Sequence, residues 1–304
     1  MVILKIGIIG LGRMGAGIAQ RIMQSGHEVF GYDIDAQNVT HAQKCGVHTV
    51  ENLIDIADNA QVLWIMVPPG NAVDTVLNTL MPALKADTIV IDGGNSNFKD
   101  SIRRARMVKE KQVAYLDCGT SGGLHGRETG YCLMVGGEKR AYDAIAPILQ
   151  LIAAPGGMAY VGPSGAGHYV KMVHNGIEYG MMQAYAEGFH ILKEGAFKNA
   201  ELDLAQISAL WNHGSIIRSW LLELAHNIFV QDQTLSAISG EIAEGGTGKW
   251  TVQEAQEHNI PAGVIQTSLD IRAQSRTNGG NYATKVVALL RNQFGGHEVK
   301  KTKT

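Results

Sequence analysis

The sequence predicts an α/β domain built on a parallel β-sheet, followed by a domain that is almost entirely helical. Three observations support this prediction. Short β-rich runs alternate with helical patterns in the first half of the 304 residues, and no convincing strand follows Val161. A run without proline at Ser164–Glu194 has the apolar spacing of one long helix. We therefore expect domains at residues 1–163 and 164–304.

The first domain is predicted from its strands. They are expected at Val2–Ile9, Glu28–Tyr32, Gln61–Val67, Thr88–Asp92, Val113–Asp117 and Tyr131–Val135. Helical patterns lie between some of them, at Arg13–Ser25 and Ser96–Glu110. Such alternation indicates βαβ units with right-handed crossovers.

After Pro163 only helical patterns continue. Beyond the long helix they occupy Leu202–His213, Ile217–His226, Lys249–His258 and Gly263–Ser275. The last segment, Lys285–Thr304, begins as a helix and ends in a Lys-rich stretch that we expect to be frayed.

Composition and charge exclude several classes of function. The net charge of −2 provides no general field for nucleic acid. No apolar run approaches the ~18–20 residues of a membrane helix, and the N-terminus lacks the basic region of a signal peptide. Three cysteines without a CxxC pair fit a reduced, cytoplasmic location and are expected in the core. No ligand spacing suggests a metal site.

A glycine-rich loop follows the first predicted strand and opens a helix. Gly10, Leu11, Gly12, Arg13, Met14 and Gly15 form the pattern GxGxxG. The pattern alone is weak in a chain with 37 glycines, but this context is typical of a Rossmann doubly wound sheet that binds a dinucleotide pyrophosphate. Asp33 ends the second strand, where a carboxylate binds ribose hydroxyls and repels a 2′-phosphate. NAD is therefore expected over NADP, although Arg13 would offset part of the repulsion.

The long predicted helix carries four polar residues on one face. Lys171, His174, Asn175 and Glu178 are spaced i, i+3, i+4 and i+7. Such spacing more commonly marks a solvated stripe. Here the surrounding sequence is apolar and rich in glycine and methionine, and the helix starts at the predicted domain junction, where ligands bind. A lysine and a glutamate about 10 Å apart along one helix could serve the two ends of a small acid.

Three further segments are candidates for the same site. Asp92–Ser96 follows the fourth strand, at the crevice of a doubly wound sheet. Ser121, Gly122 and Gly123 follow the fifth strand, where their backbone N–H groups can bind an anion. Arg291 and His297 place two cationic side chains near the C-terminus. Each segment alone is as readily a turn or a tail.

Together these motifs resemble the 6-phosphogluconate dehydrogenases (decarboxylating) of the short type, in the β-hydroxyacid dehydrogenase superfamily. The resemblance covers essentially the whole chain. It rests on Gly10–Gly15, Asp92–Ser96, Ser121–Gly123, His168–Tyr179, Gly246–Thr251 and Arg291–His297. It implies oxidative decarboxylation of 6-phospho-D-gluconate to D-ribulose 5-phosphate and CO2, with reduction of NAD.

The resemblance also implies a role for each matching residue. Lys171 would be the general base on the C3 hydroxyl, and Glu178 the acid that protonates C1 after CO2 leaves. The carboxylate and hydroxyls of the substrate would be held by Asn95, Ser121, Gly122, Gly123, His174 and Asn175. The phosphate would be bound by Tyr179, Thr247 and Arg272. Val67 and Pro68, with Asn95, would contact the cofactor.

Assembly and substrate charge are further implications of the resemblance. Arg291 and His297 would reach the partner subunit's site, which makes the protein a homodimer or a higher homo-oligomer. The chain departs from the long NADP enzymes at two places. Gly245 stands where they carry a basic phosphate ligand, so that Lys249 is expected to compensate in part. Asp33-Ile34-Asp35 replaces their Asn-Arg-Thr, which removes the arginine that would bind a 2′-phosphate.

The implied chemistry agrees with the residues. Oxidation at C3 gives a β-keto acid, which loses CO2 without a metal if a cation polarises the carbonyl. Neutral Lys171 can take the hydroxyl proton and, once protonated, stabilise the enolate; this needs a depressed pKa from partial burial. Two alternatives remain: a dehydrogenase for a small unphosphorylated 3-hydroxy acid, and a non-catalytic NAD sensor. The expected phosphate ligands argue against the first, and the intact set of catalytic residues argues against the second.

Overall fold

The computed structural model describes residues 3–302, which fall into two units, Met1–Met172 and Val173–Thr304. Helix α8 (Ala166–Glu194) belongs to both units, because the division falls inside it. The boundary expected from sequence, after residue 163, lies just before this helix begins.

Unit 1 is built on one sheet of eight strands in the order β3-β2-β1-β4-β5-β6-β7-β8. The strands are β1 (Lys5–Ile9), β2 (Glu28–Tyr32), β3 (His48–Thr49), β4 (Val62–Ile65), β5 (Ile89–Asp92), β6 (Ala114–Ser121), β7 (Tyr131–Gly137) and β8 (Ala153–Gly162). Strands β1 to β6 pair in parallel, as expected. β7 runs antiparallel to β6, and β8 is parallel to β7.

The strand predictions hold at all six positions, although Val2 lies outside the described residues. Two strands were missed. β3 has only two residues, and β8 (Ala-Ala-Pro-Gly-Gly-Met-Ala-Tyr-Val-Gly) contains a proline and glycines that normally interrupt strands. β8 lies at the edge of the sheet, where a residue without a backbone N–H is tolerated.

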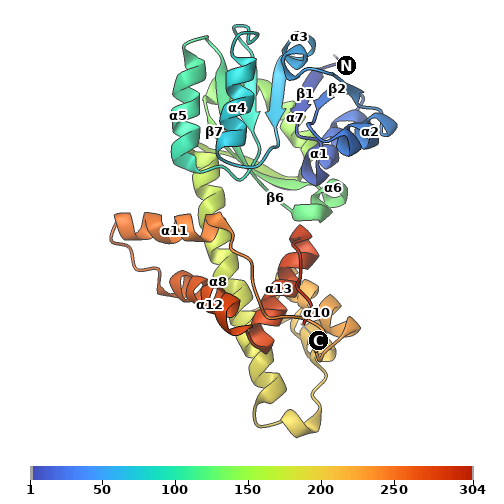
Figure 1. Ribbon diagram of the computed structural model, residues 1–304, viewed down its shortest axis with the longest axis vertical. Coiled ribbons are helices and arrows are strands. Elements are labelled where there is room, and N and C mark those ends of the chain that lie inside the picture. Colours follow the sequence, from blue (N-terminus) through green and yellow to red (C-terminus); the bar gives the residue numbers. More distant parts are fainter. Residues whose placement is uncertain (1–2, 303–304) are drawn as a thin grey trace. The chain divides into compact units, whose positions relative to one another are not determined.

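Helices cover both faces of this sheet (Figure 1). The helical elements of unit 1 are α1 (Arg13–Gln24), α2 (Ala36–Lys44), η1 (Leu53–Asp55), α3 (Ile56–Asn59), α4 (Asn71–Leu80), α5 (Phe98–Lys109), η2 (Gly123–His125), α6 (Gly126–Thr129) and α7 (Lys139–Ile152). One core cluster joins the sheet to α1 and α7, and a second joins it to α3, α4 and α5. This sandwich presents the loops after β1, β4 and β5 at the carboxyl edge of the parallel strands.

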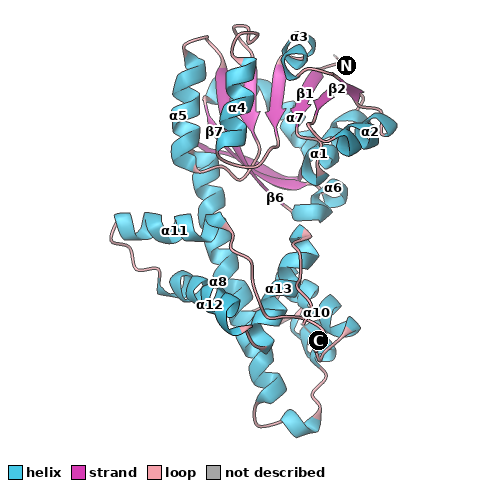
Figure 2. Ribbon diagram, in the orientation of Figure 1, coloured by secondary structure: helices cyan, strands magenta, loops and turns pink. Residues whose placement is uncertain are grey.

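Within its described residues, unit 2 consists of helices and loops (Figure 2), with a single isolated β-bridge between Ile238 and Lys301. After α8 come η3 (Lys198–Ala200), α9 (Leu204–Trp211), α10 (Trp220–Gln231), α11 (Gly246–Glu257), α12 (Gly263–Asn278) and α13 (Tyr282–Gly295). The predicted helices are confirmed, with α11 and α13 beginning a few residues earlier than expected. The core contains Phe189 of α8, Phe229 of α10 and Leu290 of α13, each essentially inaccessible.

Two expectations are corrected by the structure. The described part of the Lys-rich tail is not frayed, since the Lys300 carbonyl accepts a hydrogen bond from the Ser239 amide at 2.8 Å and the Thr302 amide donates to the Ala237 carbonyl at 3.0 Å. Of the cysteines only Cys118 is buried; Cys45 and Cys132 are exposed. Within residues 3–302, no helix combines the length and apolar character that a bilayer crossing requires.

Candidate active site

The predicted dinucleotide loop has the shape that its glycines require. Gly10 has a φ of +98°, and a Cβ there would lie 2.5 Å from the carbonyl oxygen of Met66. A Cβ on Gly15 would lie 1.9 Å from the Gly10 carbonyl oxygen. A Cβ on Gly12, in contrast, would meet no heavy atom of the described residues within 4 Å. The backbone is therefore closely packed at Gly10 and Gly15, whereas space remains beside Gly12 at the start of α1. A pyrophosphate group suits such a space at a helix N-terminus.

The Asp33 carboxylate is held in place by three hydrogen bonds. Its Oδ2 accepts hydrogen bonds from the Leu11 amide at 2.6 Å and from Asn38 at 3.1 Å, while Oδ1 accepts one from the Asp35 amide at 2.8 Å. The carboxylate is thereby fixed beside the glycine loop at the end of β2. Arg13 is exposed in the first turn of α1. The residues present therefore fit a dinucleotide with an unmodified ribose.

The loops after β4 and β5 adjoin the glycine loop. A Cβ on Gly10 would lie 3.3 Å from Val67 Cγ1, and one on Gly94 would lie 3.1 Å from the Val67 carbonyl oxygen. Pro68 and Asn95 are both exposed on these loops. The structure thus brings together the predicted cofactor residues after three neighbouring strands.

The start of α8 is anchored on the sheet by Asp117, which the sequence analysis missed. The Asp117 carboxylate is fully buried and accepts hydrogen bonds from the Gly165 amide at 2.7 Å and the His168 amide at 2.9 Å. It therefore satisfies N–H groups at the helix N-terminus, where negative charge is favourable. An aspartate inside an otherwise apolar β run was the only signal for it.

Lys171 lies where this anchor places it. Its side chain is 6% exposed, and a Cβ on Gly119 of β6 would lie 2.4 Å from the Lys171 Cβ. Only glycine at position 119 lets the helix approach this closely. β6 then ends at Ser121, and Gly122 and Gly123 follow with φ of +123° and +52°. Strand β6 therefore contacts Lys171 through Gly119 and leads directly into the predicted anion-binding turn.

In unit 2, the other three polar residues of the α8 face contact one another and α11. His174 Nδ1 lies 3.0 Å from Asn175 Oδ1 and 3.9 Å from Glu178 Oε2. Asn175 Nδ2 donates to Thr247 Oγ1 at 3.2 Å. The stripe is thus a connected polar cluster rather than a row of solvated side chains.

Glycines bring α8 and α11 close enough for this cluster. A Cβ on Gly176 would lie 2.6 Å from Thr251 Cγ2, and one on Gly248 would lie 2.4 Å from Tyr179 Cε2. Tyr179 donates a hydrogen bond to the Gly245 carbonyl at 3.4 Å. Thr247 and Lys249 lie in the first turn of α11, where the positive end of the helix dipole favours an anion.

A hollow of about 190 Å³ lies beside these residues. It is lined by Tyr179, Glu244, Gly245, Lys249, Gln266, Leu269, Asp270, Arg272, Ala273 and Arg276. Arg272 is 2% exposed, and its guanidinium carbon lies 3.4 Å from the centroid of the Tyr179 ring. None of its guanidinium nitrogens has a hydrogen-bond partner among residues 3–302. Burial lowers the pKa of Arg272 to about 10. A buried cation without acceptors indicates an anionic ligand.

Arg291 is also buried in unit 2, at 6% exposure. Burial lowers the pKa of Arg291, and Tyr179 and Glu178 of the same chain act against this shift. Arg291 in turn contributes to the lowered pKa of Arg272. The resemblance implied that Arg291 acts in the partner subunit's site, and this stays a prediction. His297 is exposed, with its ring edge-on to Phe294 at 6.3 Å, so a role in the partner's site stays a prediction for it.

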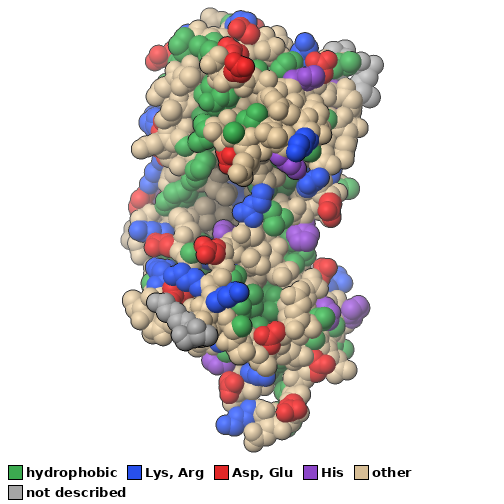
Figure 3. Space-filling model, turned by 45° about the vertical axis from the view of Figure 1, so that its right-hand side comes forward, with side chains coloured by type: hydrophobic (Ala, Val, Ile, Leu, Met, Phe, Trp, Pro, Cys, Tyr) green, Lys and Arg blue, Asp and Glu red, His purple; other side chains and the backbone are tan. Residues whose placement is uncertain are grey.

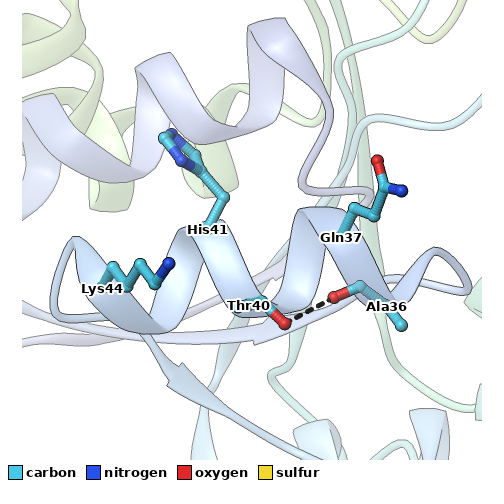
Figure 4. Close-up of a pocket in the computed structure, with 5 residues that line it drawn as sticks. All are labelled: Ala36, Gln37, Thr40, His41 and Lys44. Carbon is cyan, nitrogen blue, oxygen red and sulfur yellow. Dashed lines mark hydrogen bonds between the residues drawn. The ribbon is translucent and has the colours of Figure 1, made fainter.

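A second hollow, of about 350 Å³, lies along the outer side of α2. It is lined by Ala36, Gln37, Thr40, His41 and Lys44 (Figure 4). All five come from one helix, and the Thr40 hydroxyl is bonded to the Ala36 carbonyl at 2.8 Å. It holds none of the predicted catalytic residues. Charges of both signs are scattered over the face drawn in Figure 3 rather than gathered into a basic patch.

Comparison with known proteins covers both units. Residues 5–164 match the family model of the NAD binding domain of 6-phosphogluconate dehydrogenase, and residues 167–303 match that of its C-terminal domain. The chain is 45% identical over 301 residues to the NAD(+)-dependent, decarboxylating 6-phosphogluconate dehydrogenase of Haloferax volcanii, covering 97% of this chain and 98% of the relative. It is 35% identical to the NADP(+)-dependent enzyme of Bacillus subtilis, covering 88% of this chain and 60% of that protein.

Solved structures also resemble this chain. A 6-phosphogluconate dehydrogenase of Plasmodium falciparum matches with a TM-score of 0.82 at 33% identity, over 90% of this chain and 62% of that one. The chain thus spans about three fifths of the longer enzymes. A 3-hydroxyisobutyrate dehydrogenase of Mycobacterium tuberculosis shares the fold, with a TM-score of 0.76 at 20% identity over 95% of this chain and all of that one. With both domain models matched along its length, the chain belongs to the 6-phosphogluconate dehydrogenase family.

Proposed function

We propose that the protein oxidatively decarboxylates 6-phosphogluconate to ribulose 5-phosphate and CO2, with reduction of NAD. The observation that carries this proposal is Arg272, a buried guanidinium that has no hydrogen-bond acceptor in the described part of the chain and lines a hollow with Tyr179 and Lys249. A phosphorylated substrate supplies the anion that this cation lacks. A small unphosphorylated 3-hydroxy acid has no phosphate for Arg272 to bind, so a dehydrogenase for such a substrate is disfavoured.

The reaction steps are assigned to residues of α8. Lys171 takes the proton from the C3 hydroxyl, and bound NAD supplies the acceptor for the hydride that leaves C3. The protonated Lys171 then stabilises the oxygen of the β-keto acid as the C1 carboxylate departs as CO2, which leaves an enolate. Glu178 delivers the proton that converts the enolate into the product. The burial of Lys171 against Gly119 of β6 supports its role as the base.

Substrate contacts are assigned along the same lines. We propose that Asn95 and the turn at Ser121–Gly123 bind the carboxylate end and that His174 and Asn175 bind the hydroxyls. Tyr179, Thr247 and Arg272 bind the phosphate. Lys249 lines the same hollow and provides part of the positive charge that Gly245 lacks. A side chain at position 245 would press on Tyr179, because its Cβ would lie 2.7 Å from the tyrosine hydroxyl.

NAD is proposed as the preferred cofactor, held by Gly10–Gly15, Asp33, Val67, Pro68 and Asn95. The support is the fixed Asp33 carboxylate, which would repel a 2′-phosphate, and the NAD(+)-dependent relative of Haloferax volcanii. We further propose a cytoplasmic homo-oligomer, consistent with three free thiols. NADP is the less favoured cofactor.

Initial rates with 6-phosphogluconate, measured with NAD and with NADP, test the proposal. Formation of ribulose 5-phosphate and CO2 in equal amounts with NADH is the expected result. The matched control is 3-hydroxyisobutyrate, which has the hydroxy acid but no phosphate. A higher kcat/KM with this control than with 6-phosphogluconate would overturn the assignment of substrate.

A further inference from the structure

A buried polar network lies behind the loops after β4 and β5. Its centre is Asp92, the last residue of β5, which is fully buried. Its Oδ2 accepts hydrogen bonds from the Ser96 hydroxyl at 2.7 Å and the Tyr115 hydroxyl at 2.9 Å, and its Oδ1 accepts one from the Gly94 amide at 3.2 Å. These bonds fix the loop that carries Asn95.

Arg104 of α5 connects this loop to the one after β4. Its side chain is fully buried. Nη1 donates to Ser96 at 3.2 Å and to Asp92 at 3.4 Å, whereas Nη2 donates to the Gly70 carbonyl at 2.9 Å. Nε donates to Asp74 at 2.9 Å, in the first turn of α4. One planar group therefore holds the start of α4 and the loop after β5 at a set separation.

The two loops lie close together in front of this group. A Cβ on Gly93 would lie 2.1 Å from Trp64 Nε1 and 2.7 Å from Met66 Sδ, and one on Gly94 would lie 3.1 Å from the Val67 carbonyl oxygen. The Gly93 amide also donates to the Ile65 carbonyl at 2.9 Å, so sheet pairing and these side chains fix the first residues of both loops. Arg104 joins the loops farther along, at Gly70 and Asp74 on one side and at Ser96 on the other.

The geometry is specific to arginine. Neutralising buried Asp92 requires only one cation, but Arg104 also binds a backbone carbonyl and a second carboxylate. The Arg104 guanidinium holds the pKa of Asp74 below its ordinary value, and burial beside Asp92 raises the pKa of Tyr115, which keeps its hydroxyl a donor. A lysine ammonium has no rigid fork with which to make these bonds together.

We propose that Arg104 is a positioning residue that sets the separation of the Val67–Pro68 loop from the Asn95 loop and so shapes the cofactor site. The inference rests on the proposed function in giving both loops to the NAD side of the site. Arg104 itself touches neither cofactor nor substrate in this proposal.

Arg104→Lys tests the proposal against Arg103→Lys. Arg103 is 52% exposed and binds the same Asp74 at 2.8 Å, but reaches neither loop. We expect Arg104→Lys to raise the Kd of NAD, measured by calorimetric titration, by about tenfold, equivalent to about 1.4 kcal/mol. Amide hydrogen exchange should accelerate in both segments, 66–70 and 93–97; in the first segment the exchanging amides are those of Met66, Val67 and Gly70, because Pro68 and Pro69 have none. Arg103→Lys should leave both measurements within about twofold of the parent.

Tyr115→Phe provides a second, milder test in case Arg104→Lys does not fold. It removes one donor to Asp92 and leaves Arg104 in place, so exchange should accelerate at 93–97 and not at 66–70. Equal effects of the two arginine variants, or a lower melting temperature with unchanged Kd and loop exchange, would overturn the proposal. So would a Tyr115→Phe variant that loosens both loops or neither. A parent protein that binds NAD but does not oxidise 6-phosphogluconate would contradict only the proposed function.

Discussion

Replacing Arg272 by methionine should weaken phosphate binding and leave the unliganded fold as stable as before, or more stable. Methionine keeps an unbranched side chain against the Tyr179 ring but removes the charge. A pKa lowered to about 10 from the ordinary arginine value corresponds to about 3 kcal/mol by which folding disfavours the charged form. The stacking on Tyr179 offsets about 2 kcal/mol of this penalty. The net change in the free energy of unfolding is therefore expected between about 0 and +1 kcal/mol.

The pH dependence of this penalty has a definite sign. Because the folded pKa of Arg272 lies below the unfolded value, the penalty is fully present at all pH values below about 10. It disappears as the pH rises above about 10 towards the higher unfolded pKa, where the unfolded chain loses the proton as well. The advantage of the methionine variant should therefore be complete at neutral pH.

The effect on substrate binding should be much larger and opposite in sign. A guanidinium that forms two charge-assisted hydrogen bonds with a phosphate contributes about 3–6 kcal/mol. Removing it should raise the Kd of 6-phosphogluconate at least about 100-fold. NAD affinity should stay within about twofold, because the dinucleotide loop belongs to unit 1.

Two measurements check this reasoning. Urea unfolding of the unliganded parent and Arg272→Met gives the change in stability, and calorimetric titration with 6-phosphogluconate gives the change in Kd. Arg276→Met is a suitable control, because Arg276 already donates to the Ile242 carbonyl and pairs with Glu244. A destabilisation of Arg272→Met by more than about 2 kcal/mol, or an unchanged Kd, would refute the assignment of Arg272 as an anion ligand kept at the expense of stability.

Three further predictions concern the cofactor, the chemistry and the assembly. Asp33→Asn should shift the ratio of kcat/KM values towards NADP, and a parent enzyme that already prefers NADP would contradict the reasoning. Lys171→Ala should slow hydride transfer by at least ~10²-fold, whereas Glu178→Gln should mainly slow protonation after CO2 loss; single-turnover absorbance and product release separate the two steps. Arg291→Ala mixed with Lys171→Ala should regain activity if Arg291 completes a partner's site. No recovery, with hybrids confirmed by native mass measurement, would assign Arg291 to its own chain.

Local patterns in the sequence determined much of this protein before any contact was known. The glycine loop at Gly10–Gly15, Asp33 at the end of β2 and the polar face of α8 were all identified from spacing, because strand ends and helix faces repeat over a few residues. The long helix at Ala166–Glu194 followed from an uninterrupted period without proline. These features suffice to predict the fold class and the cofactor.

Only the tertiary structure decided which buried polar groups support the site. Asp117 binds amides of residues about 50 positions later, and Arg104 joins two loops through Gly70 and Asp92. No short-range period encodes such pairs, because each partner is chosen by the sheet order and not by its neighbours in sequence. The same reason explains the missed edge strand β8 and the burial of Arg291 in its own unit. Long-range packing also left the Arg272 guanidinium without a hydrogen-bond acceptor among residues 3–302, and this is the physical basis for proposing a phosphorylated substrate.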